Sequence, residues 1–216
     1  MISASTSILL FTRATIADRA LFRAVRVSLS VSPGRGRLLL DASRGNAFQP
    51  TFQRQVEHLY DIGRSSFEAP WEQADLVLSP CASQTSLDGA SASLPIFVAW
   101  LSLLCGAALE EPFYATGVAA PITGALTPAP RPYIEGKLKV ADALARAATR
   151  PLSRQRVWVP EGSDFEPAET PALVIREVSS LTQAASEILG VAHRAQITAR
   201  APALAAPALP TIEERS

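Results

Sequence analysis

Lysine is nearly absent from this sequence, although basic residues as a class are not. Of the 20 Lys and Arg residues, only Lys137 and Lys139 are lysine, and the other 18 are arginine. Cysteine is as rare, because Cys81 and Cys105 are the only two in 216 residues. Two thiols are too few for a disulfide framework, so a reducing compartment is expected. The two lysines invite a search for chemistry that arginine cannot perform.

The sequence has no excess of charge of either sign. Lys+Arg and Asp+Glu both number 20, and neither sign forms a long run, so no nucleic-acid or membrane partner is indicated. The apolar patch at residues 8–11 has no basic segment before it, which argues against a signal peptide. The longest apolar stretch, residues 94–109, contains Pro95 and is followed by two glutamates, so it predicts a buried helix. We expect a cytoplasmic location.

Several motifs that carry known chemistry are missing. There is no GxxxxGKS or GxxxxGKT string to hold phosphates, so the sequence predicts no ATP site and no cofactor. There is no HExxH string and no Cys/His spacing typical of a metal site. The GxSxG string of a nucleophile elbow is also missing, so nothing points to a Ser-His-Asp triad.

Strands and helices are predicted to alternate, which indicates the α/β or α+β class. The sequence favours a hairpin with strands near 25–31 and 38–40 around a Pro33–Gly36 turn, and a helix from Pro50 to Gly63. Later elements are expected at 74–80 (strand), in an apolar stretch that ends at 106 (helix), and at 113–126 (two short strands), 138–149 (helix), 156–162 (strand and turn), 172–178 (strand) and 179–190 (helix). Residues 127–136 are predicted to be a proline-rich loop.

The length favours one substantial domain with tails. Residues 21–194 are predicted to be this domain, and residues 1–20 an N-terminal extension. Residues 195–216 are rich in Ala and Pro and have no periodic apolar face, so they are predicted to be a flexible tail.

The stretch DGASAS, residues 88–93, is the first candidate for chemistry. Its small residues precede the long apolar helix and leave backbone N–H groups accessible, and the first turn of that helix has free donors. A hydroxyl there would lie beside a ready oxyanion site. The alternative is that Ser91 or Ser93 is only the N-cap of the helix.

The lysines are the second candidate, because an ammonium can lose its proton when it is desolvated or held at a helix N-terminus. Lys139 is expected to open the helix LKVADALARA, where the dipole disfavours its charged form and Leu138 and Val140 exclude water. The alternative is that both lysines only decorate the start of a helix.

In this order and at about this distance, the two motifs resemble the proteolytic domain of the Lon family, the Ser/Lys peptidases. DGASASLPIFVAWLSLLCG is similar to the family's D-G-P-S-A-G string and the helix after it, and IEGKLKVADALARA to its I-G-G-L-K-E-K-L-L-A-A segment. YATGVAAPITGAL resembles the T-G-E-I-T-L-x-G-x-V string between them. The resemblance extends over residues 22–190.

The resemblance implies roles for particular residues. It places the nucleophile at Ser91, the base at Lys139, and at Thr116 a threonine that assists the lysine. The supporting positions of the two motifs are Asp88, Gly89, Ala90, Ala92 and Gly136, with oxyanion donors around residues 90–93.

The sequence departs from the family pattern in ways that bear on the site. Ala90 stands where the family has proline, and Ser93 where it has glycine. The paired glycines before the lysine are GK here. Extra residues fall in TPAPRPY, so Lys137 becomes the alternative base if the register slips by two positions.

The resemblance also implies a fold and an activity. The fold is a compact α/β domain of the ribosomal S5 domain 2-like kind, and the activity is cleavage of peptide bonds in unfolded proteins or peptides. Lon proteins carry an AAA+ ATPase and form hexamers, so a homo-oligomer and a separate AAA+ unfoldase are the implied partners. The alternative is an inactive Lon-fold interaction module, such as a pseudoprotease or the N-terminal domain of the magnesium-chelatase-like ComM proteins.

Overall fold

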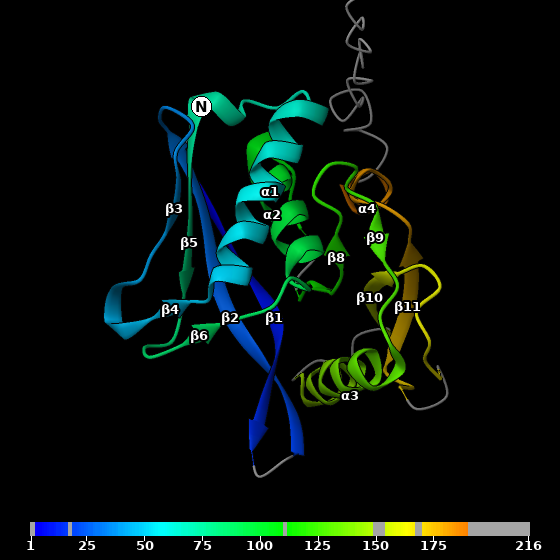
Figure 1. Ribbon diagram of the computed structural model, residues 1–216. Coiled ribbons are helices and arrows are strands. Elements are labelled where there is room, and N and C mark those ends of the chain that lie inside the picture. Colours follow the sequence, from blue (N-terminus) through cyan, green and yellow to red (C-terminus); the bar gives the residue numbers. More distant parts are fainter. Residues whose placement is uncertain (1–2, 17–18, 110–111, 149–153, 167–169, 190–216) are drawn as a thin grey trace, which may run out of the picture.

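The computed structural model describes residues 3–16, 19–109, 112–148, 154–166 and 170–189. These residues form a four-stranded sheet, a three-stranded sheet, two short two-stranded pairs and helices packed on them (Figure 1). The protein therefore has a mixed α+β architecture. The predicted tail, residues 195–216, lies outside the described residues.

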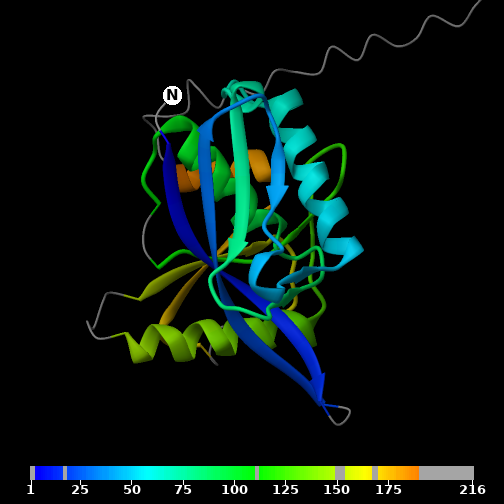
Figure 2. The same cartoon turned by 90° about the vertical axis from the view of Figure 1, so that its left-hand side faces the viewer.

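A long antiparallel hairpin opens the chain. Its strands, β1 (Ala4–Ile16) and β2 (Arg19–Pro33), pair along their whole length, from Ala4 opposite Val31 to Ile16 opposite Arg19. The end of the hairpin projects from the body of the molecule next to α3 (Figure 2). The predicted boundary between residues 20 and 21 falls inside this hairpin, and β1 forms an edge strand of the main sheet.

Alternate residues of β1 face two different hydrophobic clusters, because successive side chains of a strand point to opposite faces. Ile8 and Leu10 belong to the larger cluster, whereas Phe11 belongs to the smaller cluster and Leu9 packs against it. On β2, Val25 and Val27 join the larger cluster. One hairpin is therefore shared by both parts of the core.

The four-stranded sheet has the order β1-β2-β5-β3, with β5 (Ala74–Pro80) and β3 (Leu38–Leu40) completing it. The predicted hairpin between β2 and β3 is wrong, because β5 lies between them and pairs antiparallel with β2 and parallel with β3. Asp75 of β5 explains the path of the turn. Its carboxylate accepts hydrogen bonds from the backbone N–H groups of Arg35 and Arg37, both 3.0 Å away.

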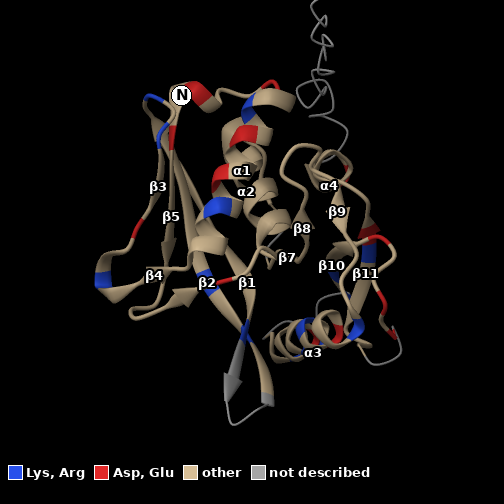
Figure 3. Ribbon diagram, viewed as in Figure 1, with Lys and Arg blue, Asp and Glu red and all other residues tan. Residues whose placement is uncertain are grey.

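The larger cluster is built around α1 (Pro50–Ser66) and α2 (Ser93–Cys105). α2 carries no charged residue and is almost wholly buried, whereas α1 carries charged residues at exposed positions (Figure 3). α2 ends at Gly106, which has a left-handed φ of 68°. Gly63 does not end α1 as predicted. It instead makes room for Trp71, since a Cβ atom there would lie 2.4 Å from Cζ2 of that ring.

The second part of the molecule contains a parallel three-stranded sheet and α3 (Arg131–Ala147), which packs against the hairpin and β11. The sheet has the order β11-β10-β7, formed by β7 (Tyr114–Ala115), β10 (Gln155–Pro160) and β11 (Leu173–Val178). α3 begins well before the predicted residue 138, with a proline in its first turn. This earlier start changes which side chains face inward.

The remaining elements are short. They are η1 (Ser43–Gly45), β4 (Ala47–Phe48), η2 (Trp71–Gln73), β6 (Ser86–Leu87), β8 (Val118–Ala119), β9 (Leu126–Thr127) and α4 (Leu181–Leu189). The predicted serine cap of the last helix is confirmed, because the backbone N–H of Gln183 donates to Oγ of Ser180 at 3.1 Å. Among the described residues, no helix is both long and apolar enough to cross a membrane.

Candidate active site

The loop before α2 holds Ser91 in a fixed position. Gly89 adopts a φ of 84°, which a residue with a side chain rarely does, and its N–H donates to the carboxylate of Asp88 at 2.6 Å. Both the N–H and the hydroxyl of Ser93 donate to the carbonyl of Ala90, at 3.1 and 2.5 Å. The carbonyl of Ser91 in turn accepts from the N–H of Gly117 at 2.9 Å. The small residues of DGASAS thus form a tight turn tied to the segment after β7.

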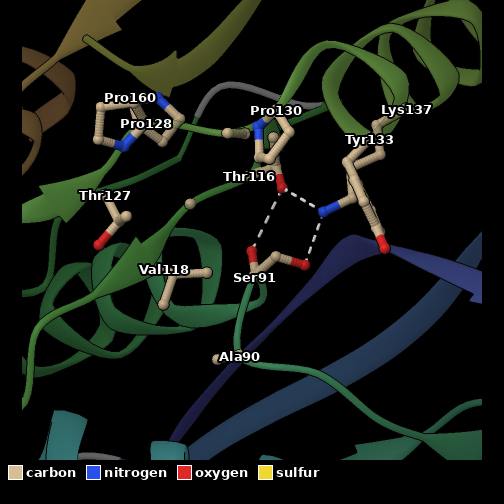
Figure 4. A pocket seen from close by; sticks show the side chains of 12 residues that line it. Ala90, Ser91, Thr116, Val118, Thr127, Pro128, Pro130, Tyr133, Lys137 and Pro160 are labelled. Atoms are coloured by element: carbon tan, nitrogen blue, oxygen red, sulfur yellow. Dashed lines mark hydrogen bonds between the residues drawn. The ribbon is translucent and has the colours of Figure 1, made fainter. Parts of the chain in front are cut away.

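Lys137 of α3 reaches this serine. Its amine Nζ lies 2.6 Å from Oγ of Ser91 and 2.9 Å from Oγ1 of Thr116 (Figure 4). The lysine is 8% exposed although it carries an ionisable amine. Three side chains from separate segments therefore meet at one amine.

The placement corrects the assignment of Lys139 as the base. Lys139 is exposed and lies by Asp142 and Arg146, outside the cavity that Ser91 and Lys137 share. The two lysines are two positions apart on one helix, so their side chains point about 200° apart around its axis. The error came from starting the helix at residue 138, which made Lys139 a helix-opening residue. The slipped register, which makes Lys137 the alternative base, is the one that brings an amine to Ser91.

Thr116 is the third member of this cluster and is 3% exposed. Its hydroxyl accepts from Nζ of Lys137 and donates to the carbonyl of Ser91 at 3.3 Å. Its N–H donates to the carbonyl of Trp158 at 3.0 Å, which ties the segment to β10. Thr116 therefore lies beside Lys137 rather than beside Lys139, the lysine with which the resemblance paired it.

Burial lowers the pKa of Lys137 from 10.5 to about 8. The physical cause is that the amine is removed from water, which disfavours its charged form. None of the described carboxylates forms an ion pair with it. The helix dipole, which the sequence-based argument used, is not the cause, because Lys137 lies inside α3 rather than at its first turn.

A cavity of about 420 Å³ opens beside Ser91 and Lys137. Most of its walls are apolar, so it offers an uncharged surface next to the serine hydroxyl (Figure 4). The lining residues that the sequence did not point to are Val118, Thr127, Pro128, Ala129, Pro130, Tyr133 and Pro160. The available signal was the proline-rich segment TPAPRPY, whose pattern predicts a loop with extra residues and not part of a site.

The supporting positions have distinct places. Ala90 lines the cavity, and Ala92 pairs with Gly117 as an isolated bridge. Gly136 lies on α3 against the hairpin, where a Cβ atom would be 2.3 Å from the ring of Phe22. Asp88 is exposed and stabilises the turn rather than lining the cavity.

In the described part of the chain, no three His, Cys, Asp or Glu side chains gather as a possible metal site. No protein-family model and no curated protein matches the chain.

Proposed function

We propose that this protein is a serine endopeptidase in which Ser91 is the nucleophile and Lys137 the general base. The observation that carries the proposal is the 2.6 Å separation between Nζ of the buried Lys137 and Oγ of Ser91. A serine hydroxyl becomes reactive when an adjacent base takes its proton. The collinear likeness to the Lon proteolytic domain supports Ser91 as the nucleophile, allows Lys137 as the base in the slipped register, and supports the ribosomal S5 domain 2-like fold.

The reaction begins with the neutral form of Lys137. With a pKa of about 8, roughly a tenth of the amine is uncharged at pH 7, and most of it above pH 9. The neutral amine accepts the proton of Ser91 while Oγ attacks the carbonyl carbon of the peptide. The resulting ammonium then gives this proton to the leaving amine, and a water molecule hydrolyses the acyl-enzyme with Lys137 again acting as base. Thr116 holds the amine toward Ser91 throughout.

Backbone donors for the oxyanion are proposed at Ser91 and Ala92. Within the described residues, the N–H groups of these two residues take part in no backbone hydrogen bond, whereas that of Ser93 donates to Ala90. Donors that are held rigidly near a developing oxyanion stabilise the transition state by several kcal/mol, on the order of 3 for one donor. The turn before α2 supplies such rigidity because hydrogen bonds fix both of its sides.

The apolar cavity is proposed to receive a side chain of the substrate. Its volume of about 420 Å³ accommodates a leucine or phenylalanine side chain, and its walls offer no carboxylate or guanidinium to pair with a charged one. We therefore propose apolar residues next to the cleaved bond, in unfolded proteins or peptides. A separate AAA+ unfoldase, a homo-oligomeric assembly and a cytoplasmic location belong to the same proposal and rest on the family resemblance and the low cysteine content.

Cleavage of casein and of short peptides tests this function. Ser91→Ala and Lys137→Met are expected to abolish cleavage and labelling by a fluorophosphonate, since only an activated serine reacts. Lys139→Met is the matched control, because it removes the other lysine of the same helix and is expected to retain wild-type activity. Full activity of either site variant would refute the assignment. A folded wild-type protein that neither cleaves nor becomes labelled would favour the non-catalytic Lon-fold module.

A further inference from the structure

Tyr133 lies at the mouth of the cavity, on the same face of α3 as Lys137. The two residues are four positions apart, which places their side chains next to each other on the helix surface, and both line the cavity (Figure 4). Tyr133 is 43% exposed, whereas Lys137 is 8% exposed. Tyr133 is thus the solvent-exposed neighbour of the buried Lys137 on this face of α3.

Residues from the β1–β2 hairpin hold this ring. Nη1 of Arg13 donates to the phenol oxygen of Tyr133 at 2.5 Å, and the guanidinium carbon lies 4.9 Å from the ring centroid. From the other strand, the ring of Phe22 meets Tyr133 edge-on, with centroids 6.4 Å apart and planes at 84°. Phe22 also contacts α3 at Gly136, where there is no side chain to keep it away. We call Arg13, Phe22 and Tyr133 the tyrosine clamp.

Within the residues that the structure describes, no other charged side chain lines the cavity and faces the Lys137 amine, so burial is the feature that sets this amine apart. Among the described residues that line it, Lys137 and Tyr133 are the only ionisable side chains. On α3, Arg131 and Glu135 form an ion pair with each other. On the hairpin, Arg23 donates to the hydroxyl of Thr12 at 3.4 Å, and Arg13 is the cation that contacts the clamp.

We propose that Tyr133 is a positioning residue whose clamped ring keeps water from the Lys137 amine, so that the β1–β2 hairpin is part of the active site. Arg13 and Phe22 select the orientation in which the ring covers the amine, because an exposed tyrosine could otherwise occupy more than one staggered χ1 rotamer. The proposal rests on the Ser91–Lys137 peptidase, since it assigns the means by which the amine of the base is kept away from water. A clamp on the hairpin also connects the base to a segment far away in the sequence.

The chain allows a direct test, because it contains only two lysines. Protein labelled with ¹³Cε-lysine gives two lysine signals, and Lys139→Arg assigns the one that remains to Lys137. The signals are followed between about pH 6 and 11 in the wild type, Tyr133→Ala, Tyr133→Phe, Arg13→Ala and the control Arg23→Ala. No substrate is present, so effects on substrate binding do not enter.

Tyr133→Ala is expected to raise the midpoint of the Lys137 titration by about one pH unit or more, because water reaches the amine. Tyr133→Phe and Arg13→Ala keep a ring but release it, so smaller shifts in the same direction are expected. The Arg13→Ala shift should persist in about 0.5 M NaCl, which screens direct repulsion between two cations. Arg23→Ala, on the same hairpin, is expected to leave the midpoint unchanged.

The proposal would be overturned if the Lys137 titration in folded Tyr133→Ala has the same midpoint as in the wild type. It would also be overturned by an Arg13→Ala shift that disappears in high salt, since that result assigns the effect to charge alone. The outcome is separate from the peptidase assignment, which fluorophosphonate labelling of the wild type decides. If Tyr133→Ala is an active enzyme, its labelling rate should recover at high pH, whereas damage to the fold would lower the rate at every pH.

Discussion

Replacing Lys137 with methionine is expected to stabilise the protein at neutral pH while abolishing its proposed activity. The lysine places an amine that is charged at pH 7 into a site with 8% exposure, and no described carboxylate compensates for it. Methionine has a similar length and no charge to bury. The substitution therefore isolates the free energy of holding the amine away from water.

The pKa gives the size and the sign of the effect. A pKa lowered from 10.5 to about 8 corresponds to about 3 kcal/mol of lost stability when the amine is protonated in both the folded and the unfolded states. This penalty is complete below pH 8, decreases between pH 8 and 10.5 as the folded state loses its proton first, and is absent above pH 10.5. Methionine leaves the hydroxyls of Ser91 and Thr116 without the amine, at a cost of about 1 kcal/mol. The net gain expected at pH 7 is about 2 kcal/mol.

Urea unfolding of the wild type and Lys137→Met at pH 7 and near pH 10.5 measures this gain. The variant should be more stable at pH 7, and the difference should almost vanish or reverse at the higher pH. Lys139→Met is the control, because an exposed position is expected to change stability by no more than about 0.5 kcal/mol at either pH. A variant that is less stable at pH 7, or a difference that is independent of pH, would refute the account of a dry, uncompensated amine.

Two further predictions concern the active site, and a third concerns the packing of α1. The kcat/KM for peptide cleavage should rise with pH and level off above a midpoint near the Lys137 pKa of about 8, and a profile that falls over this range would contradict a lysine base. Thr116→Val should lower kcat by about tenfold or more with little change in thermal unfolding, because the amine loses the contact that orients it. Gly63→Ala should destabilise the fold by about 1–3 kcal/mol through overlap with Trp71, measured by urea unfolding, whereas helix propensity alone predicts stabilisation.

The parts of the fold that depend on local pattern were predictable. The strand at residues 74–80 and the apolar helix that ends at Gly106 were expected at nearly the observed bounds. Their signals are a short apolar run and a glycine in the left-handed region, and neither requires knowledge of distant residues. The Ser91 loop was predictable for the same reason, because a run of small residues before an apolar helix can be identified from the local sequence alone.

Long-range pairing was not predictable in the same way. β3 follows β2 after a short turn, yet β5 separates them, and the carboxylate of Asp75 that holds the turn comes from much later in the sequence. No pattern within residues 25–40 indicates that partner. The chain does turn between β2 and β3 as the local sequence indicates, but both strands pair with β5 instead of with each other.

The identity of the base depended on a helix boundary. The prolines of residues 128–132 indicated a loop, whereas Pro132 is in fact in the first turn of α3, a position where proline is favoured. Placing the start correctly would have put Lys137, not Lys139, on the same face as the buried Ile134. Tyr133 had no signal of its own, because its importance depends on a hairpin more than a hundred residues away.

The β1–β2 hairpin separates the two hydrophobic clusters, because Ile8 and Leu10 pack into the larger cluster and Phe11 packs into the smaller one. Neither cluster is shielded from water without this hairpin. A truncated chain that starts at residue 21 should therefore lose the packing of both clusters, and its backbone amides should exchange with solvent throughout. Strand β1 is thereby required for the hydrophobic core of the rest of the chain.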